Sequence, residues 1–503
     1  MEYLDCILMG FKVSLQLENI LFCFIGVCLG NLVGVLPGIG PLTTISLLLP
    51  MTFHFPPVSA VIMLAGIYYG SQYGGTITSV LVNIPGEPSS IVTTLDGYQM
   101  ALKGRAGPAL GIAAFGSFIA GTVSLFGLMF LVIPLSSVAL SFQAPEYTAL
   151  VLLGLSLLVY IASRSKLKAG ISILVGIIIS CGGIDTLSGI TRFDYGLMVL
   201  SDGVGIVPLA IGLFGVSEIL VNLEESKSYA IIKTNLRSLL PSVKDWTASK
   251  WAILRGTLIG FLFGIIPGGG SIVSSFVSYT VEKKMSKYPE RFGTGVIEGV
   301  AGPESANNSA CSGSFIPLFA LGIPPNVVMA LLMGALIIHG VTPGPLTMKE
   351  HPEIFWGVVA SMYTGNVILL ILNIPLIAVW IRILKVPYKI LFPLILLFCL
   401  IGTYSINNQA DELIVMTIFG VFGYLGKKLN FEMAPLILAF VLGPIFEQSL
   451  RQSLVISDGS FSIFITRPIS AILIFISISL LFVNLFGSAK KLSKLVKRIS
   501  KKE

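Results

Sequence analysis

Charged residues are scarce in this sequence. Of its 503 residues only 11% are Asp, Glu, Lys or Arg, whereas 54% are hydrophobic. A soluble domain has about 25% charged residues, so this composition excludes an ordinary soluble protein and predicts a chain that lies in a lipid bilayer. Segments of about ten residues with alternating hydrophobicity, which would indicate a transmembrane β-barrel, are missing as well.

Three further absences narrow the functional classes. The sequence has no GxxxxGK[ST] phosphate-binding loop, so ATP hydrolysis at a site of that type is not expected. The six cysteines lie mostly in apolar runs without paired spacing, which favours buried thiols over a disulfide or a metal site. The first residues, MEYLDCILMGFK, have no basic region and no small-residue cleavage site, so no removable signal peptide is expected.

Apolar runs long enough to cross a bilayer recur from Ile20 to Phe486. We therefore expect an all-α polytopic membrane protein. The positive charge is concentrated in Ala489–Glu503, which holds seven basic residues and one acid, while the net charge of the chain is +7. The basic balance therefore comes largely from one tail and does not indicate nucleic-acid binding. Because basic residues mark the cytoplasmic side of a membrane, the C-terminus is expected in the cytoplasm.

One pattern, Gly-x-x-x-Gly-x-x-Pro-Gly-x-Gly, occurs twice, at 30–40 and at 260–270, each time at the end of an apolar run. The short apolar segments that follow, 42–51 and 271–280, are expected to be half-helices or re-entrant segments. Hydrocarbon cannot hydrogen-bond backbone N–H and C=O groups, and glycine and proline interrupt the helical bonding that satisfies these groups. Such breaks therefore survive only where they are buried in protein or line a cavity. A matched pair of breaks predicts two repeats with a transporter binding site between them.

The charges of corresponding loops predict that the repeats have opposite orientation. Thr52–Pro57 is uncharged, whereas its counterpart Glu282–Arg291 carries four basic residues. The bias reverses in the next pair, where Asp96–Arg105 carries two basic residues and Leu346–Glu353 carries one lysine and two acids. Because basic loops face the cytoplasm, we expect two inverted repeats with broken helices. Such repeats are found in elevator-like transporters, an analogy at the level of the fold.

The same features divide the chain into four parts. The long polar segment 222–250 is the natural joint between the repeats. The expected parts are a first transmembrane repeat half at 1–221, a cytoplasmic connector at 222–250, a second transmembrane repeat half at 251–486 and a basic cytoplasmic tail at 487–503.

A small, polar, glycine-rich phrase follows each break, at 69–90 and at 302–326. Hydroxyls and amides there supply donors and acceptors, and a helix that begins at a break points free N–H groups and its positive dipole end at a bound anion. Helix packing is the alternative use of such glycines, and Gly26, outside both phrases, is expected to tolerate substitution better than Gly40 or Gly270. The residues expected to bind substrate are Gly38, Gly40, Thr43, Thr44, Gly74, Gly75, Thr76, Asn83, Gly268, Gly270, Ser271, Ser312 and Ser314.

Glu304 is the acid most suited to ion coupling. A carboxyl group inside a membrane indicates a proton carrier or a cation ligand, and the alternative is an interfacial acid hydrogen-bonded to Asn307 or to backbone. Glu87 and Asp96 lie near a loop and are expected to be solvated. No cofactor is expected, and no metal beyond a transported Na⁺. The residues expected to couple the ion, Na⁺ or H⁺, are Glu304, Asn307, Asn308, Ser274 and Ser275.

Several of these motifs are similar to those of the large permease subunit of the tripartite tricarboxylate transporters, the TctA family. They are GVLPGIGP at 34–41, YGSQYGGT at 69–76, NIPGEP at 83–88, DGY at 96–98, GRAGPALG at 104–111, PESANN at 303–308 and HGVTPGP at 339–345. The resemblance extends from about residue 20 to at least residue 450. It implies that citrate or another organic carboxylate is taken up across a bacterial cytoplasmic (inner) membrane by ion-driven symport. It also implies two partners, a small TctB-like membrane subunit and a periplasmic TctC-like binding protein.

Two other functional classes compete with a secondary transporter. One is a passive anion channel. The other is an intramembrane serine protease with Ser312 as nucleophile and His339 as base, although a Ser-Gly pair in a glycine-rich chain carries little information. We expect that the chain is not an enzyme.

Overall fold

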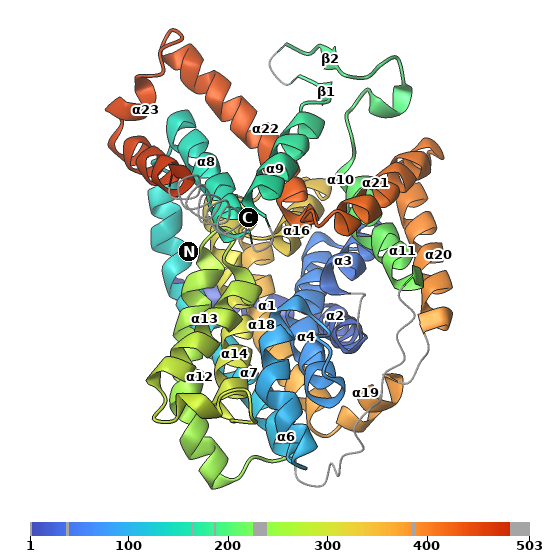
Figure 1. Cartoon of the computed structure of the whole chain (residues 1–503). Helices are drawn as coiled ribbons and strands as arrows, with labels where there is room; N and C mark the ends of the chain where they lie inside the picture. The colour runs from blue at the N-terminus through green and yellow to red at the C-terminus, as the bar shows by residue number, and fades with distance from the viewer. Residues whose placement is uncertain are drawn as a thin grey trace, which may run out of the picture. The chain divides into compact units, whose positions relative to one another are not determined.

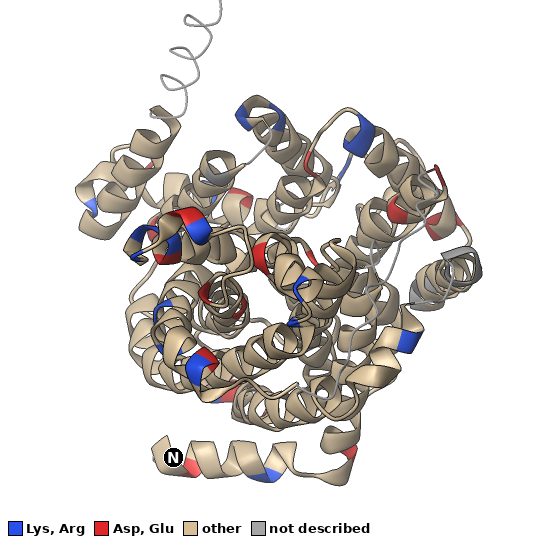
Figure 2. Cartoon of the chain, turned by 60° about the horizontal axis from the view of Figure 1, so that its bottom comes forward, with Lys and Arg blue, Asp and Glu red and all other residues tan. Residues whose placement is uncertain are grey.

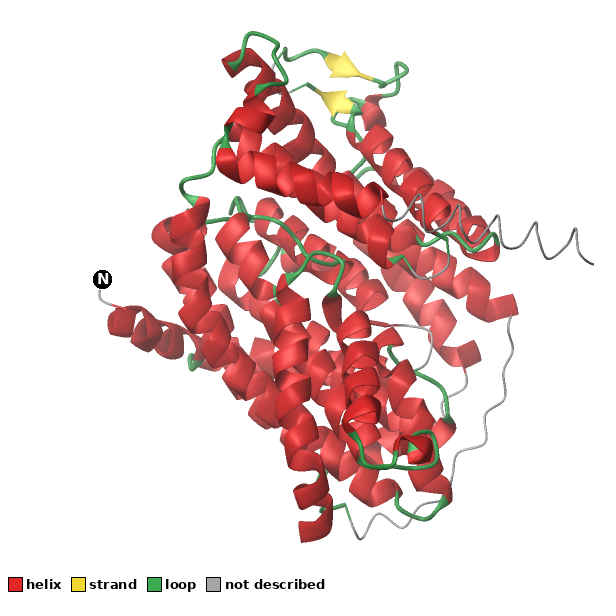
Figure 3. Ribbon diagram, turned by 60° about the vertical axis from the view of Figure 1, so that its left-hand side comes forward, coloured by secondary structure: helices red, strands yellow, loops and turns green. Residues whose placement is uncertain are grey.

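The computed structural model of the chain describes residues 3–36, 40–162, 165–185, 188–224, 239–384 and 388–482. Most of the described chain is helical (Figure 3), and charged residues are sparse along the helices (Figure 2). One short antiparallel strand pair is described, with Gly183 opposite Arg192 and Ile184 opposite Thr191. The predicted all-α membrane class is confirmed.

Six helical segments of the described chain are long and apolar enough to cross a membrane. They are α2 (Leu17–Val35), α7 (Ala106–Ala139), the continuous run Ile206–Glu224, α12 (Val243–Ile265), α18 (Pro352–Asn373) and α22 (Met433–Ile456). Four shorter apolar helices lie at Ala144–Tyr160, Val327–Ile338, Phe392–Ser405 and Pro468–Phe482.

The chain forms two compact units, and each draws on both predicted halves. Unit 1 consists of Met1–Leu140 and Ile206–Tyr424. Besides α2, α7, α12 and α18 it contains α1 (Tyr3–Ser14), α3 (Gly40–Thr52), α4 (Pro57–Val82), η1 (Pro88–Ser90), α5 (Ile91–Thr93), η2 (Thr94–Tyr98), α6 (Gln99–Leu102), α10 (Ile206–Ala210), η4 (Ile211–Val216), α11 (Ser217–Glu224), α13 (Gly270–Met285), η6 (Pro289–Arg291), α14 (Glu298–Gly313), α15 (Phe315–Leu321), α16 (Val327–Ile338), α17 (Thr347–Glu350), α19 (Ile377–Ile383), α20 (Tyr388–Asn407) and most of α21 (Asp411–Lys428).

Unit 2 consists of Ser141–Gly205 and Leu425–Glu503. It contains α8 (Ala144–Ile161), α9 (Lys166–Ser180), β1 (Gly183–Ile184), β2 (Thr191–Arg192), η3 (Met198–Leu200), α22 and α23 (Ile463–Thr466). Ion pairs join the strand loop to α22, because Arg192 pairs with Glu447 and Arg451 pairs with Asp185. The predicted basic tail, 487–503, lies outside the described residues, as do residues 225–238 of the predicted connector; α12 begins at Val243, within that connector.

Two helix pairs form the centre of unit 1, α2 with α4 and α12 with α14 (Figure 1). Glycines allow each pair to approach closely. A Cβ added at Gly30 would lie 2.4 Å from the Ile67 carbonyl oxygen, and one at Gly260 would lie 2.1 Å from the Ala306 carbonyl oxygen. Gly30 and Gly260 are the first residues of the two copies of the repeated pattern, so the first glycine of each copy allows two helix backbones to pack closely.

A long helix from each repeat packs on the centre of the other. α7 packs on α12 and α14, and α18 packs on α2 and α4. Small residues make room here too, because a Cβ at Gly116 of α7 would lie 3.0 Å from Ser305 Oγ, and one at Gly365 of α18 would lie 2.0 Å from the Tyr69 hydroxyl. The two repeats are therefore interlocked within unit 1.

Candidate functional site

Each repeated pattern ends where a short helix begins. α3 starts at Gly40 with φ +65°, and α13 starts at Gly270 with φ +55°. Glycine adopts this left-handed conformation without strain, which explains its presence at both positions. The helices have 13 and 16 residues, so at 1.5 Å per residue they are about 20 and 24 Å long, shorter than a bilayer core of about 30 Å. The predicted short segments thus exist as helices; Gly38 lies outside the described residues.

At the first break, the turn after α4 packs into the space left by glycines. A Cβ at Gly75 would lie 2.9 Å from the Cβ of Glu87, and one at Gly86 would lie 1.9 Å from the Gly34 carbonyl oxygen. Glu87 is thereby buried, with 7% of its surface exposed. Its Oε2 atom has no well-oriented hydrogen-bond partner among the described residues, although the Gln72 amide lies close. A solvated Glu87 was expected, and that expectation is wrong.

At the second break, the corresponding turn is neutral. The Gly268 N–H donates to the Pro325 carbonyl oxygen at 2.8 Å. The Asn326 amide nitrogen donates to Ser314 Oγ at 3.1 Å and to the Tyr68 hydroxyl at 3.2 Å. Its oxygen accepts from the Met329 N–H at 3.0 Å, which caps α16. Asn326 therefore lies between Gly270 and Ser314, a predicted substrate ligand, and hydrogen-bonds the serine.

Glu304 lies fully buried in α14 and joins the two polar phrases. Thr76 of α4 donates to its Oε2 atom at 2.6 Å, and Asn307 donates to the same oxygen at 3.1 Å. The hydroxyl of Thr93, in α5, donates to Oε1. Three donors on one buried carboxyl group compensate part of the cost of removing it from water. Two predicted ion-coupling residues, Glu304 and Asn307, are thus brought together with Thr76, which was predicted to bind substrate.

Asn308 extends this network into α7. Its amide nitrogen donates to Ser117 Oγ at 2.8 Å and to Asn307 Oδ1 at 2.6 Å. Ser117 in turn donates to the Glu304 carbonyl oxygen at 3.2 Å. Thr93 and Ser117 were not identified from the sequence, because both lie in apolar surroundings outside the quoted motifs.

Most of the other predicted hydroxyl ligands bond to backbone. The Thr43 hydroxyl donates to the Phe214 carbonyl at 3.0 Å, and that of Thr44 donates to the Gly40 carbonyl at 3.1 Å. Ser274 and Ser275 donate to the Ser271 carbonyl at 2.9 Å and also lie 3.3 Å from carbonyl oxygens of α14, those of Ala306 and Pro303. The two serines therefore hold α13 against α14.

The remaining predicted residues lie around these contacts. A Cβ at Gly74 would lie 2.1 Å from the Asn31 carbonyl oxygen, so Gly74 serves helix packing. Asn83 is exposed and ends α4 in a left-handed conformation, with φ 60°. Ser312 is buried in α14. Gly26 also serves close helix packing, because a Cβ there would lie 2.3 Å from the Met63 carbonyl oxygen, and this geometry argues against the milder effect expected for a substitution at this position.

Asp96 is buried as well, contrary to the expectation of a solvated acid. Its carboxylate accepts hydrogen bonds from the backbone N–H groups of Gly293, Gly295 and Val296 at 2.7 to 3.0 Å and from the Tyr279 hydroxyl at 2.8 Å. These donors lie in the second repeat and Asp96 lies in the first. Asp96 therefore ties η2 to the loop that precedes α14.

The residues proposed for a protease are not paired. The His339 imidazole, at the end of α16, hydrogen-bonds the backbone of Thr52, and its Nε2 atom has no partner among the described residues. Burial lowers the pKa of His339, more than the bond to Thr52 raises it. No hydrogen bond joins His339 to Ser312 within the described parts of the chain. This arrangement gives no support to a serine nucleophile activated by histidine.

Comparison with known proteins agrees with the sequence motifs. An "Uncharacterized 52.8 kDa protein in TAR-I ttuC' 3'region" of Agrobacterium vitis is 48% identical over 490 residues, which cover 97% of this chain and 98% of that protein. An "Uncharacterized protein in TAR-II ttuC' 3'region" of the same organism is 52% identical over 215 residues, which cover 43% of this chain and 89% of that protein. No solved structure matches the chain. The family model "Tripartite tricarboxylate transporter TctA family" matches residues 20–438, and the chain therefore belongs to that family.

Proposed function

We propose that the chain is the large transmembrane permease subunit of a tripartite secondary transporter. It imports tricarboxylates such as citrate, or related organic carboxylates, and a Na⁺ or H⁺ gradient drives the uptake. The substrate binds near the membrane midplane between the two glycine breaks. This site opens by alternating access, to one side of the membrane at a time. A small TctB-like membrane subunit and a periplasmic TctC-like binding protein complete the system in the bacterial inner membrane.

The observation that carries this proposal is the buried carboxyl group of Glu304. It lies with 0% exposure in a helix of the second repeat and accepts hydrogen bonds from Thr76 and Thr93 of the first repeat. A proton or cation that binds there changes the contacts between the repeats directly. Such a link between an ion and the packing of two repeats is what coupled transport requires.

Contacts at the ends of unit 1 support inverted repeats. Lys103 donates to the Thr294 carbonyl oxygen, and Arg105 pairs with Asp245. The loop after α6 and the loop before α14 therefore lie at the same end of unit 1, although they are not corresponding loops of the two repeats. Their respective counterparts are the loops Leu346–Glu353 and Thr52–Pro57. His339, a few residues before the first of these loops, hydrogen-bonds the backbone of Thr52. In each contact a loop of one repeat meets a non-corresponding loop of the other, and the second contact exchanges the roles of the two repeats. A two-fold axis in the membrane plane produces this pattern.

The breaks favour an anionic substrate. α3 and α13 begin with glycines, and the first N–H groups of a helix have no partner inside it. Arg255, a cation within the long apolar helix α12, is occupied by two hydrogen bonds to Glu282, at 2.6 and 2.7 Å. Backbone N–H groups and hydroxyls, rather than an arginine, are therefore proposed to bind the carboxylates.

Uptake by purified protein in liposomes tests the proposal. The chain is reconstituted with its two partner subunits, and a set of labelled mono-, di- and tricarboxylates is screened with a Na⁺ gradient or a pH gradient. We expect one or a few carboxylates to accumulate above the outside concentration, and ionophores that collapse the gradient to abolish accumulation. Equilibration without accumulation would favour the passive channel instead.

A further inference from the structure

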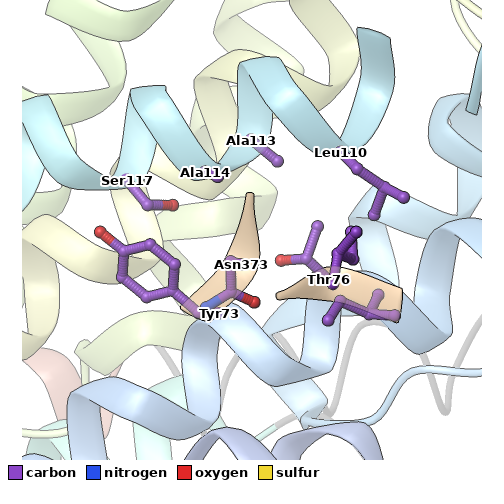
Figure 4. Close-up of a pocket in the computed structure, with 9 residues that line it drawn as sticks. Tyr73, Thr76, Leu110, Ala113, Ala114, Ser117 and Asn373 are labelled. Carbon is purple, nitrogen blue, oxygen red and sulfur yellow. The ribbon is translucent and has the colours of Figure 1, made fainter. Parts of the chain in front are cut away.

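A small cavity lies beside the Glu304 network. Its volume is about 10 Å³, close to the minimum for one water molecule. Four polar side chains reach it, Tyr73 and Thr76 from α4, Ser117 from α7 and Asn373 from the end of α18 (Figure 4). Its apolar lining consists of Ile77, Leu110, Ala113, Ala114 and Ile377.

Two of the polar atoms have no partner. The Tyr73 hydroxyl and the Asn373 Oδ1 atom are buried without a hydrogen bond from any described residue. The two side chains are only 3% and 4% exposed. Buried polar atoms are almost always bonded, so each exception calls for an occupant such as water or an ion. The Asn373 amide nitrogen donates one hydrogen to the Leu369 carbonyl at 2.9 Å, and the Asn373 oxygen is the atom of this amide that has no partner among the described residues.

The remaining oxygens also offer lone pairs. Thr76 uses its one hydrogen on Glu304, and Ser117 uses its hydrogen on the Glu304 backbone. All four polar groups that line the cavity offer oxygen lone pairs, and the hydrogens left to donate are that of the Tyr73 hydroxyl and the second amide hydrogen of Asn373. A site made of oxygen acceptors repels an anion and suits a hard cation. The Glu304 carboxyl group lies one hydrogen bond behind Thr76 and supplies negative charge.

We propose that this cavity binds one Na⁺ ion through the oxygens of Tyr73, Thr76, Ser117 and Asn373. The inference rests on the proposed function, because it identifies Na⁺ as the coupling ion. It also assigns Thr76 to the cation and not to the substrate. Asn373 belongs to the second repeat and the other three ligands belong to the first, so the ion holds α18 against α4 and α7. Loss of the ion would free these helices to move relative to each other.

The test uses Tyr73→Phe, which removes one ligand and leaves the ring. The full chain, purified in detergent without substrate, is heated at one pH in rising NaCl, with choline chloride keeping the ionic strength constant. We expect a saturable rise in the unfolding temperature of the wild type. Tyr73→Phe should need about fivefold more Na⁺ for the same rise.

Tyr69→Phe is the matched control. Tyr69 lies one turn earlier in α4 and is equally buried, and its hydroxyl lies 3.6 Å from the Cys23 thiol, away from the cavity. This variant should respond to Na⁺ like the wild type. If Tyr73→Phe does not fold, Asn373→Leu removes the second free oxygen and should show the same increase in the Na⁺ requirement.

Three outcomes would overturn the site. They are a wild type without saturable Na⁺ stabilisation, equal Na⁺ requirements in Tyr73→Phe and the wild type, and, when the titration is repeated at a second pH, stabilisation that follows pH but not Na⁺, which would indicate a bound proton. The measurement is independent of transport. Saturable Na⁺ stabilisation that Tyr73→Phe weakens, together with an absence of carboxylate uptake by the complete system, would refute the transport proposal and leave the cation site intact.

Discussion

The two glycine breaks share one backbone design and differ in the side chain that lies against the glycine. In each, a short helix begins at a glycine with positive φ, and a turn from the following polar phrase lies against that glycine. A Cβ at Gly40 would lie 4.0 Å from Glu87 Oε2, and a Cβ at Gly270 would lie 4.0 Å from the Cβ of Asn326. Glu87 and Asn326 occupy the same place, each four residues after a left-handed residue that ends a helix, Asn83 or Gly322.

This difference assigns different chemistry to equivalent places. Asn326 is neutral and uses both ends of its amide, on Tyr68, Ser314 and the N–H of Met329. Glu87 is an acid with one oxygen left without a well-oriented partner among the described residues. A carboxyl group repels a substrate carboxylate whenever it is ionised, whereas the Asn326 amide never carries charge, so the second break is the better place for the anion. The two breaks therefore share a backbone frame, and the different side chains at positions 87 and 326 give them different chemistry.

The largest effect is expected where the glycines themselves are replaced. Gly40→Leu and Gly270→Leu should each abolish uptake, because a side chain there forces a strained φ and blocks the approach of the substrate to the free N–H groups. Uptake and membrane abundance are measured together. Gly340→Leu is the control, since it carries the same strain, with φ +75°, in open space. Equal loss of uptake in the control would attribute the effect to strain alone.

A large effect on coupling is expected at Glu304. Glu304→Gln keeps the shape but removes the charge that Thr76, Thr93 and Asn307 bind. The concentration of coupling ion for half-maximal uptake should rise at least about tenfold, which corresponds to about 1.4 kcal/mol. Glu290→Gln, at an exposed turn, should leave it unchanged. An unaltered ion dependence in Glu304→Gln would leave the network a structural contact only.

Substitutions of Asn326 and Glu87, the side chains that distinguish the two breaks, test which break binds the substrate carboxylate. Asn326→Asp places a negative charge at the second break and should raise the substrate concentration for half-maximal uptake about tenfold by repulsion. Glu87→Gln makes the first break neutral and should leave that value within about twofold. Initial uptake rates over a range of substrate concentrations give both numbers. The reverse result would place the substrate carboxylate at the first break.

The smallest effect on activity is expected from the cysteines that test orientation. Lys103→Cys and Lys283→Cys should resist an impermeant thiol reagent in whole cells, whereas Glu350→Cys should react with it. Uptake should stay near the wild-type level, because these exposed side chains lie at helix ends away from the breaks. Labelling of Lys283→Cys from outside would contradict the inverted arrangement and with it the equivalence of the two breaks.

The sequence predicted the helical membrane class, the short helices after each break and the partnership of Glu304 with Asn307. These features follow from local patterns, namely apolar length, positive-φ glycines and a spacing of three residues along a helix. The contacts of Glu304 with Thr76 and Thr93 could not be predicted, because they depend on which helices meet. The same reason explains the errors at Glu87 and Asp96. The turn at Glu87 packs into the space left by Gly75 and Gly34, and Asp96 is covered by the loop at 293–296.

The exchange of α7 and α18 between the repeats has a consequence for how the protein is made. α7 leaves the ribosome long before α12 and α14, the helices on which it packs. Until those helices enter the membrane, the small and polar face of α7, with Gly116 and Ser117, has no partner from its final structure. The first repeat therefore cannot mature by itself, and the last steps of assembly must wait for the second. A chain cut between the repeats is expected to regain uptake only when both pieces are produced in the same cell.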